Sequence, residues 1–153
     1  SNLAAKAGLI EKPTAPTPPV TGQTKEQAQA LYKATMDGFI VSSGSKTPVT
    51  IDKVNSFRIV ENGTPFEMNG VKVTKVNLEE TPNGAAVSIT QEGTGKSVSA
   101  FAEIYLNEGK YGYWESVERG STGHWWIRDF KPELVKAIIF DDGNYNMTMV
   151  KLK

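Results

Sequence analysis

The chain contains no cysteine and only one histidine, His124, among its 153 residues. The absence of cysteine excludes disulfides, thiolate catalysis and cysteine-based zinc sites. A single histidine also excludes metal centres that need two or three imidazoles from one chain. Only carboxylate-rich calcium or magnesium sites remain open, and we expect no metal and no cofactor.

The sequence also lacks an excess of charge of either sign and any long apolar run. Lys and Arg total 17 and Asp and Glu total 17, so the formal net charge is zero. Nothing therefore drives non-specific attraction to nucleic acid or to anionic lipid. No apolar run approaches the roughly 20 residues that a membrane-spanning helix needs. We expect no nucleic-acid partner and no membrane span.

Proline is concentrated near the start of the sequence. Residues 11–23 read EKPTAPTPPVTGQ, a composition that favours extended polyproline conformations and buries little apolar surface. We predict that residues 1–23 form a linker or tether and that residues 24–153 form a single domain. Such a tether is common in exported, lipoprotein-like proteins, although proline-rich linkers also join cytosolic domains. We expect an extracytoplasmic location, in the periplasm or at the cell surface.

The segment from Thr24 to about Gly38 carries the signals of one helix. Thr24 followed three residues later by Gln27 fits a capping box. The apolar residues that follow recur at helical spacing; they are Ala28, Leu31, Tyr32, Met36 and Phe39. The apolar stripe of this amphipathic helix must face a partner, and the rest of the chain offers almost only strands.

From about Val49 the pattern changes to short β-branched and aromatic runs separated by turn residues. Asn and Gly dominate the connections because both accept the positive φ of tight hairpins, and short connections predict antiparallel pairing of sequential strands. A single helical turn is expected at residues 132–134. We predict strands at 49–54, 56–61, 71–79, 85–92, 97–106, 110–118, 124–130, 136–141 and 145–152.

The segment Asp141-Asp142-Gly143-Asn144 is interpreted as one of these hairpin turns. Its oxygens could be offered to calcium, but it lacks the alternating ligands and the closing Glu of a calcium loop. Its residue types are also those that a hairpin turn prefers.

Together these elements predict an α+β fold, in which one N-terminal amphipathic helix packs on a strongly curved, mainly antiparallel meander sheet. The sheet is expected to form a cone or a partly closed barrel, which would give its two faces different partners. A small, lipocalin-like β-barrel is the alternative. A helix followed by an antiparallel meander is similar to the cystatin-like cone architecture, at the level of fold alone.

The register of the hairpin at residues 97–118 determines where a carboxylate lies. With a three-residue loop, Trp114 lies opposite Ala102 on the apolar face, and the other face carries Glu115 together with Tyr105, Tyr111 and Tyr113. With a two-residue turn, Glu115 lies opposite Ala102, where burial would raise its pKa and suit it to general-base chemistry. We expect the first register, because burying a lone carboxylate costs several kcal/mol.

The stretch GHWWIRDF at residues 123–130 is rich in side chains suited to binding. As a strand it places His124, Trp126, Arg128 and Phe130 on one face and Trp125 on the other. One tryptophan is then expected in the core and the other at a half-exposed surface. The alternative is that Trp125 or Trp126 stacks on a sugar ring or an aromatic ligand, with His124 and Arg128 donating hydrogen bonds.

From these patterns we expect a non-catalytic, exported binding or assembly domain that presents an aromatic-bearing sheet face to a protein or glycan partner in the cell envelope. The principal alternative is a cone or barrel pocket protein that binds a small apolar ligand or uses Glu115 as a general base. A structural subunit of a larger assembly is a third possibility. The predicted binding residues are Tyr105, Tyr111, Tyr113, His124, Trp125, Trp126 and Arg128.

Overall fold

The computed structural model describes residues 22–37, 40–41, 49–93, 99–105, 111–118, 124–128 and 130–152. Helix α1 spans Lys25–Met36, and two single turns of 3-10 helix are η1 (Ile51–Lys53) and η2 (Pro132–Leu134). The strands are β1 (Ile40–Val41), β2 (Ser56–Glu61), β3 (Phe66–Met68), β4 (Val71–Thr81), β5 (Gly84–Glu92), β6 (Ser99–Tyr105), β7 (Tyr111–Glu118), β8 (His124–Arg128), β9 (Ala137–Asp141) and β10 (Asn146–Lys151).

The predicted capping box starts α1. The Thr24 hydroxyl accepts a hydrogen bond from the backbone N–H of Gln27 at 3.1 Å, and the Thr24 N–H donates to Gln27 Oε1 at 2.9 Å. Ala28 and Tyr32 are buried as expected, but Leu31 is 37% exposed. The helix therefore packs through a narrower stripe than the periodicity predicted. Neither its length nor its hydropathy would allow it to cross a membrane, and the described residues contain no other helix that could.

Most of the predicted strands are present, and the expected helical turn is η2. Sequential strands pair antiparallel as predicted in β4–β5, β6–β7 and β9–β10. The strand predicted at 49–54 is wrong, because η1 occupies its centre. The short strand β3, which pairs antiparallel with β4, was missed.

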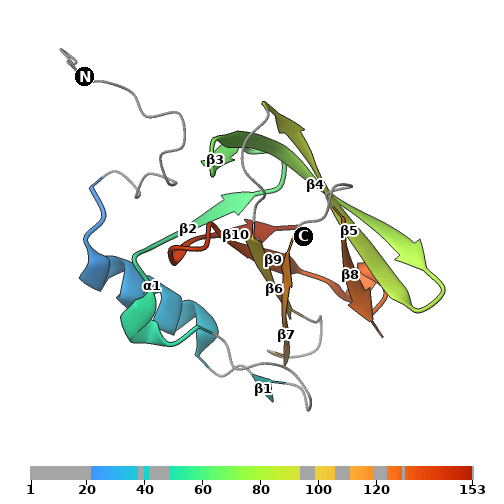
Figure 1. Ribbon diagram of the computed structural model, residues 1–153. Coiled ribbons are helices and arrows are strands. Elements are labelled where there is room, and N and C mark those ends of the chain that lie inside the picture. The colour runs from blue at the N-terminus through green and yellow to red at the C-terminus, as the bar shows by residue number, and fades with distance from the viewer. Residues whose placement is uncertain are drawn as a thin grey trace.

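The described strands form three hydrogen-bonded sheets, ordered β1-β7-β6, β2-β10-β9 and β3-β4-β5-β8. Three pairings differ from a simple meander, and the first is the parallel pairing of β1 with β7. Strand β10 pairs with β2 in parallel, and β8 pairs with β5 rather than with the strand that precedes it in the chain. In Figure 1, α1 lies beside β2, whereas the long β4–β5 hairpin extends to the opposite side of the molecule with β8 along it.

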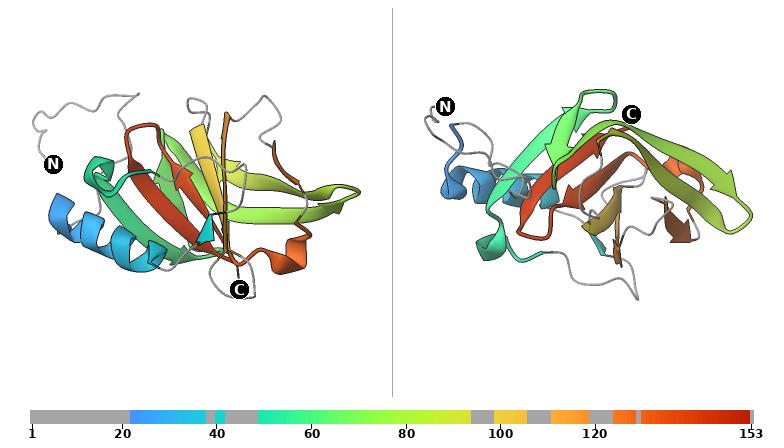
Figure 2. Two further views of the ribbon diagram at one scale, coloured as in Figure 1. Left: turned by 90° about the horizontal axis from the view of Figure 1, so that it is seen from below. Right: turned by 45° about the horizontal axis from the view of Figure 1, so that its top comes forward.

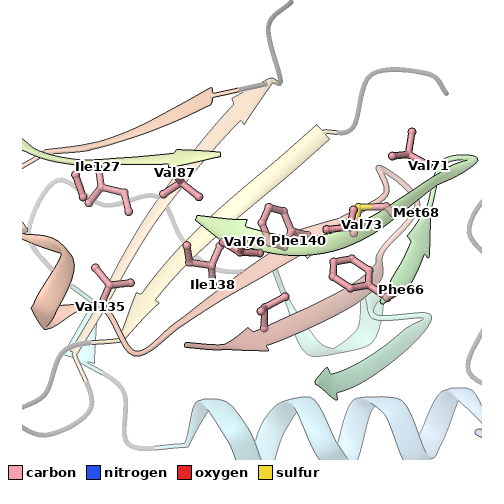
Figure 3. Packing of buried hydrophobic residues seen from close by; sticks show 12 residues of the cluster. Phe66, Met68, Val71, Val73, Val76, Val87, Ile127, Val135, Ile138 and Phe140 are labelled. Atoms are coloured by element: carbon pink, nitrogen blue, oxygen red, sulfur yellow. The ribbon is translucent and has the colours of Figure 1, made fainter. Parts of the chain in front are cut away.

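The β2-β10-β9 sheet is covered on both faces. Alternate residues of its strands, including Phe57, Ile139 and Met147, pack with Ala28 and Tyr32 of α1. The intervening residues, including Ile138 and Phe140, pack against the β3-β4-β5-β8 sheet. The right-hand view of Figure 2 shows this sheet between α1 and the β4–β5 hairpin, and Figure 3 shows Ile138 and Phe140 on the side away from α1. This double coverage explains why every residue of β9 is buried.

Arg58 on β2 joins two of the sheets. Its Nε donates to the hydroxyl of Thr148 on β10 at 2.8 Å, and its Nη2 donates to the carbonyl of Glu67 on β3 at 2.8 Å. The guanidinium carbon lies 5.4 Å from the centre of the Phe66 ring, a cation–π distance. Partial burial lowers the pKa of Arg58, while the carboxylates of Asp142 and Glu67 act in the opposite direction.

The α+β class with mainly antiparallel sheets is therefore confirmed. The sheets of the described residues do not close into a barrel. Most of the predicted linker, residues 1–23, lies outside the described ranges. Its last residue, Gln23, belongs to the folded part, because its side chain hydrogen-bonds to the backbone of Phe57.

Candidate functional site: the surface around Trp126

The outer face of the β3-β4-β5-β8 sheet carries an exposed tryptophan. Trp126 on β8 is 59% exposed, whereas the next residue, Ile127, is buried in the core. This alternation is what a strand with one face on the core produces. Trp126 therefore occupies the half-exposed surface position that was predicted for one of the two tryptophans, whereas the burial of Trp125 lies outside the described side chains.

Register places polar residues around the indole. Trp126 lies opposite Ala86 of β5, which in turn lies opposite Glu79 of β4. The next row outward on the same face contains Asn77 opposite Ser88. Because directly opposite residues point to the same side of an antiparallel sheet, these residues share one face. We call Asn77, Glu79, Ala86, Ser88 and Trp126 the Trp126 surface.

The Trp126 surface combines one large aromatic ring with three polar side chains. Asn77 and Ser88 are partly exposed and Glu79 is exposed, whereas Ala86 is almost covered. Asn77 Nδ2 donates to the hydroxyl of Thr90 at 3.1 Å, which holds the amide on the sheet. Neighbouring strands lie about 4.8 Å apart. Ser88 is on β5, the strand next to Trp126, whereas Asn77 and Glu79 are on β4, one strand further away.

His124 and Arg128 occupy the β8 positions two residues before and after Trp126. They lie opposite Ser88 and Gly84, and Trp125 lies opposite Val87. Positions 124, 126 and 128 therefore alternate with position 125 along β8, as predicted. Phe130 was expected on the same face as Trp126, but this prediction is wrong, because Phe130 packs against the core cluster that contains Ile127.

The β6–β7 hairpin has the register that the sequence analysis disfavoured. Glu115 pairs with Ala102, and Trp114 pairs with Glu103. Tyr113 lies opposite Ile104 and Tyr105 opposite Gly112, so positions 105 and 113 belong to opposite faces of the hairpin. The prediction that Tyr105, Tyr111 and Tyr113 share a single face is therefore wrong.

The turn between β9 and β10 is the second polar cluster, and it was predicted as a turn. Asp141 Oδ1 accepts hydrogen bonds from the N–H groups of Gly143 and Tyr145 at 2.8 and 3.0 Å. Asp142 Oδ1 accepts from the N–H groups of Asn144 and Asn146 at 2.7 and 3.2 Å. The two carboxylates thus serve the backbone of their own turn.

Both carboxylates are nevertheless buried, which the sequence analysis did not foresee. Asp141 is 0% exposed and Asp142 is 5% exposed. Burial raises the pKa of Asp141 to about 6, with the adjacent Asp142 contributing, although the Gly143 and Tyr145 amides oppose the shift. No group of three or more His, Asp or Glu residues suited to a metal ion occurs in the part of the chain that the structure describes.

Comparison with known proteins adds no assignment to this geometry. No family model matches the chain, and no curated protein or solved structure matches it either.

Proposed function

We propose that this protein is a non-catalytic binding or assembly domain, exported to the cell envelope, that presents the Trp126 surface to a protein or glycan partner. The observation that carries the proposal is the 59% exposure of Trp126 on the outer face of a regular antiparallel sheet. Large aromatic side chains are usually mostly buried, so an indole left on a folded surface is a candidate contact for a partner.

The surroundings of Trp126 favour a ligand with both apolar and hydroxyl or amide groups. The residue directly opposite the indole is the small Ala86, and Trp126 itself is 59% exposed. Asn77, Ser88 and Glu79 supply donors and acceptors on the same face. A sugar ring or a peptide segment combines an apolar surface with polar edges, and such a ligand suits an indole flanked by polar side chains.

The other predicted binding residues belong to two parts of the structure, strand β8 and the β6–β7 hairpin. His124 and Arg128 flank Trp126 on β8, and their side chains could donate hydrogen bonds to a partner bound there. Trp125 is retained as the second stacking candidate. Tyr105, Tyr111 and Tyr113 are retained as contacts of the β6–β7 hairpin, now divided between its two faces.

The proline-rich composition of residues 11–23 supports the proposed tether.

The proposal is tested with Trp126→Ala and the matched variant Ile59→Ala, which also removes a partly exposed apolar side chain. The proteins are screened on a glycan array and by affinity electrophoresis in gels that contain soluble envelope polysaccharides. We expect retention of the wild type and of Ile59→Ala, and a loss of about 10-fold or more in affinity for Trp126→Ala. Equal retention of all three proteins would contradict a role for Trp126.

A second candidate function is a pocket protein, in which a curved sheet shaped as a cone or partly closed barrel encloses Glu115. The observation in its favour is the hairpin register, which pairs Glu115 with Ala102. A carboxylate held in an apolar pocket would have a raised pKa and could act as a general base. In Glu115→Gln, a gain in stability at neutral pH would support a buried charge, whereas Glu103→Gln on the paired strand serves as the matched control.

A further inference from the structure

The carboxyl groups of Asp141 and Asp142 differ in their hydrogen bonds although they are neighbours in one buried turn. Both oxygens of Asp142 have donors, since Oδ1 accepts from two backbone N–H groups and Oδ2 accepts from the side-chain amide of Asn146 at 3.0 Å. Asp141 uses only Oδ1. Its Oδ2 is buried and has no donor among the described residues.

This asymmetry indicates where a proton would reside. Asp142 accepts hydrogen bonds from three donors and lies near the positive charge of Arg58, whereas Asp141 Oδ2 has no donor among the described residues. A buried carboxylate oxygen without a donor is costly, but protonation converts it into a hydroxyl that needs only an acceptor. A side-chain hydrogen bond with Asp142 is one of the causes that raise the pKa of Asp141, so the Asp142 carboxyl is the acceptor for that bond.

The turn that holds this pair connects three segments that are distant in sequence. Asn69, in the β3–β4 turn, donates from Nδ2 to the carbonyl of Asp142 at 3.1 Å. Asn55, just before β2, donates from Nδ2 to the carbonyl of Asn144 at 2.7 Å and from its backbone N–H to the carbonyl of Tyr145 at 2.9 Å. The position of the turn therefore fixes the start of β2 and one end of the β3–β4 hairpin.

We propose that Asp141 and Asp142 share one proton, as an acid–carboxylate pair with the proton on Asp141 Oδ2, and that this proton makes the turn a pH-sensitive clamp. When the proton leaves to solvent, two adjacent buried carboxylates repel each other. The turn then relaxes, and its bonds to Asn55 and Asn69 weaken. The clamp is closed under mildly acidic conditions and opens above neutrality, which is the reverse of ordinary acid unfolding.

Charged groups on the packed elements are consistent with this assignment. Arg58 of β2 is the cation that acts on Asp142, and Glu67 of β3 lies beside Arg58 and partly offsets it. The Nζ of Lys53 of η1 lies 5.9 Å from the centre of the Tyr145 ring, which belongs to the same turn. The pKa of about 6 for Asp141, against an ordinary value of 3.8, corresponds to roughly 100-fold tighter proton binding in the folded protein.

The direct test is a carboxyl ¹³C NMR titration of the full chain with assigned aspartate resonances. We expect Asp141 to titrate near pH 6, and Asp142→Asn to move that midpoint downward because the second charge is gone. Since each carboxyl is observed separately, titration of His124, the sole histidine, does not interfere. A wild-type midpoint at the ordinary value of 3.8, or a midpoint that Asp142→Asn leaves unchanged, would overturn the proposal.

Hydrogen exchange tests the clamp itself. The amides of Asn55, Gly143 and Tyr145 are followed at pH 5 and pH 8, with rates corrected for intrinsic exchange. We expect their protection to fall by about 10-fold or more at the higher pH in the wild type. In Asp141→Asn the amide keeps the Oδ1 acceptor and places a donor at the Oδ2 position, so protection should be nearly independent of pH. Equal pH dependence in both proteins would show that Asp141 does not control the turn.

Discussion

The side-chain amide of Gln23 pairs with the backbone of Phe57 as a neighbouring strand would. Its Nε2 donates to the Phe57 carbonyl at 2.8 Å, and its Oε1 accepts from the Phe57 N–H at 3.1 Å. Strand β2 is at the edge of its hydrogen-bonded sheet, so these backbone groups have no strand partner on that side. The Gln23 amide thereby occupies two backbone groups of an edge strand that could otherwise pair with another chain.

Replacing Gln23 should therefore destabilise the domain. We expect Gln23→Ala to lower the free energy of unfolding by about 1–2 kcal/mol, because both Phe57 groups lose their partner. Gln23→Glu retains an acceptor but brings a carboxylate against the Phe57 carbonyl, so it should not restore stability. Urea denaturation measures the change, with Lys33→Ala on the exposed side of α1 as the control. A Gln23→Ala protein as stable as that control would contradict the argument.

Asn62 plays the same role for β4. Its Nδ2 donates to the Val76 carbonyl and its Oδ1 accepts from the Val76 N–H, both at 2.9 Å. Strand β3 pairs only with residues 71–73, so β4 has no strand partner at Val76 on that side. We expect Asn62→Ala to cost about 1–3 kcal/mol in chemical denaturation. Asn77→Ala, which removes an exposed bond to Thr90, should cost less than half as much.

Because both faces of β9 are covered, we predict that replacing either of its two adjacent isoleucines destabilises the domain. Ile138 and Ile139 are both fully buried, one against the second sheet and the other against the helix. Each substitution to Ala should lower the free energy of unfolding by about 2–5 kcal/mol. Ile59→Ala, at a position that is 39% exposed, should cost under about 1 kcal/mol. If Ile138→Ala or Ile139→Ala left the free energy of unfolding unchanged, one of the two layers would not pack as described.

The raised pKa of Asp141 predicts an unusual dependence of stability on pH. Between the ordinary pKa of 3.8 and the folded value of about 6, the folded protein binds a proton that the unfolded chain has released. The contribution of Asp141 to stability is thus present at low pH, falls as the pH rises through this window, and is lost above it. We expect Asp141→Asn to be more stable than the wild type at pH 8 by up to about 3 kcal/mol, and equally stable near pH 4. Thermal unfolding across this range measures the difference; a variant less stable at every pH would refute it.

Local signals in the sequence were reliable where a few adjacent residues determine the structure. Thr24 and Gln27 identified the start of α1 because a capping box involves neighbours in the chain. The Asp141–Asn144 turn was identified because its own carboxylates bind its own amides. The antiparallel β9–β10 pair followed directly from that turn.

Features that depend on distant residues were not predictable in the same way. The parallel pairing of Met147 with Phe57 joins strands that are separated by most of the domain, and no local pattern specifies it. The burial of Asp141 depends on this pairing, because the turn is covered only when β2 and the β3–β4 hairpin lie against it. For Trp126 the alternation along β8 was predictable, but its neighbours Glu79 and Ala86 required knowledge that β8 pairs with β5.

The parallel β2–β10 pair also determines the order in which this domain can be assembled on the ribosome. Strand β10 is the middle strand of its sheet, yet it follows β2 and β9 in the chain. Until residues 146–151 have emerged, β2 and β9 have no strand between them, and the helix has only part of its packing surface. Such long-range closure is slow and leaves apolar surface open to other chains during synthesis. The nascent domain should therefore depend on molecular chaperones to prevent aggregation until β10 has been synthesised.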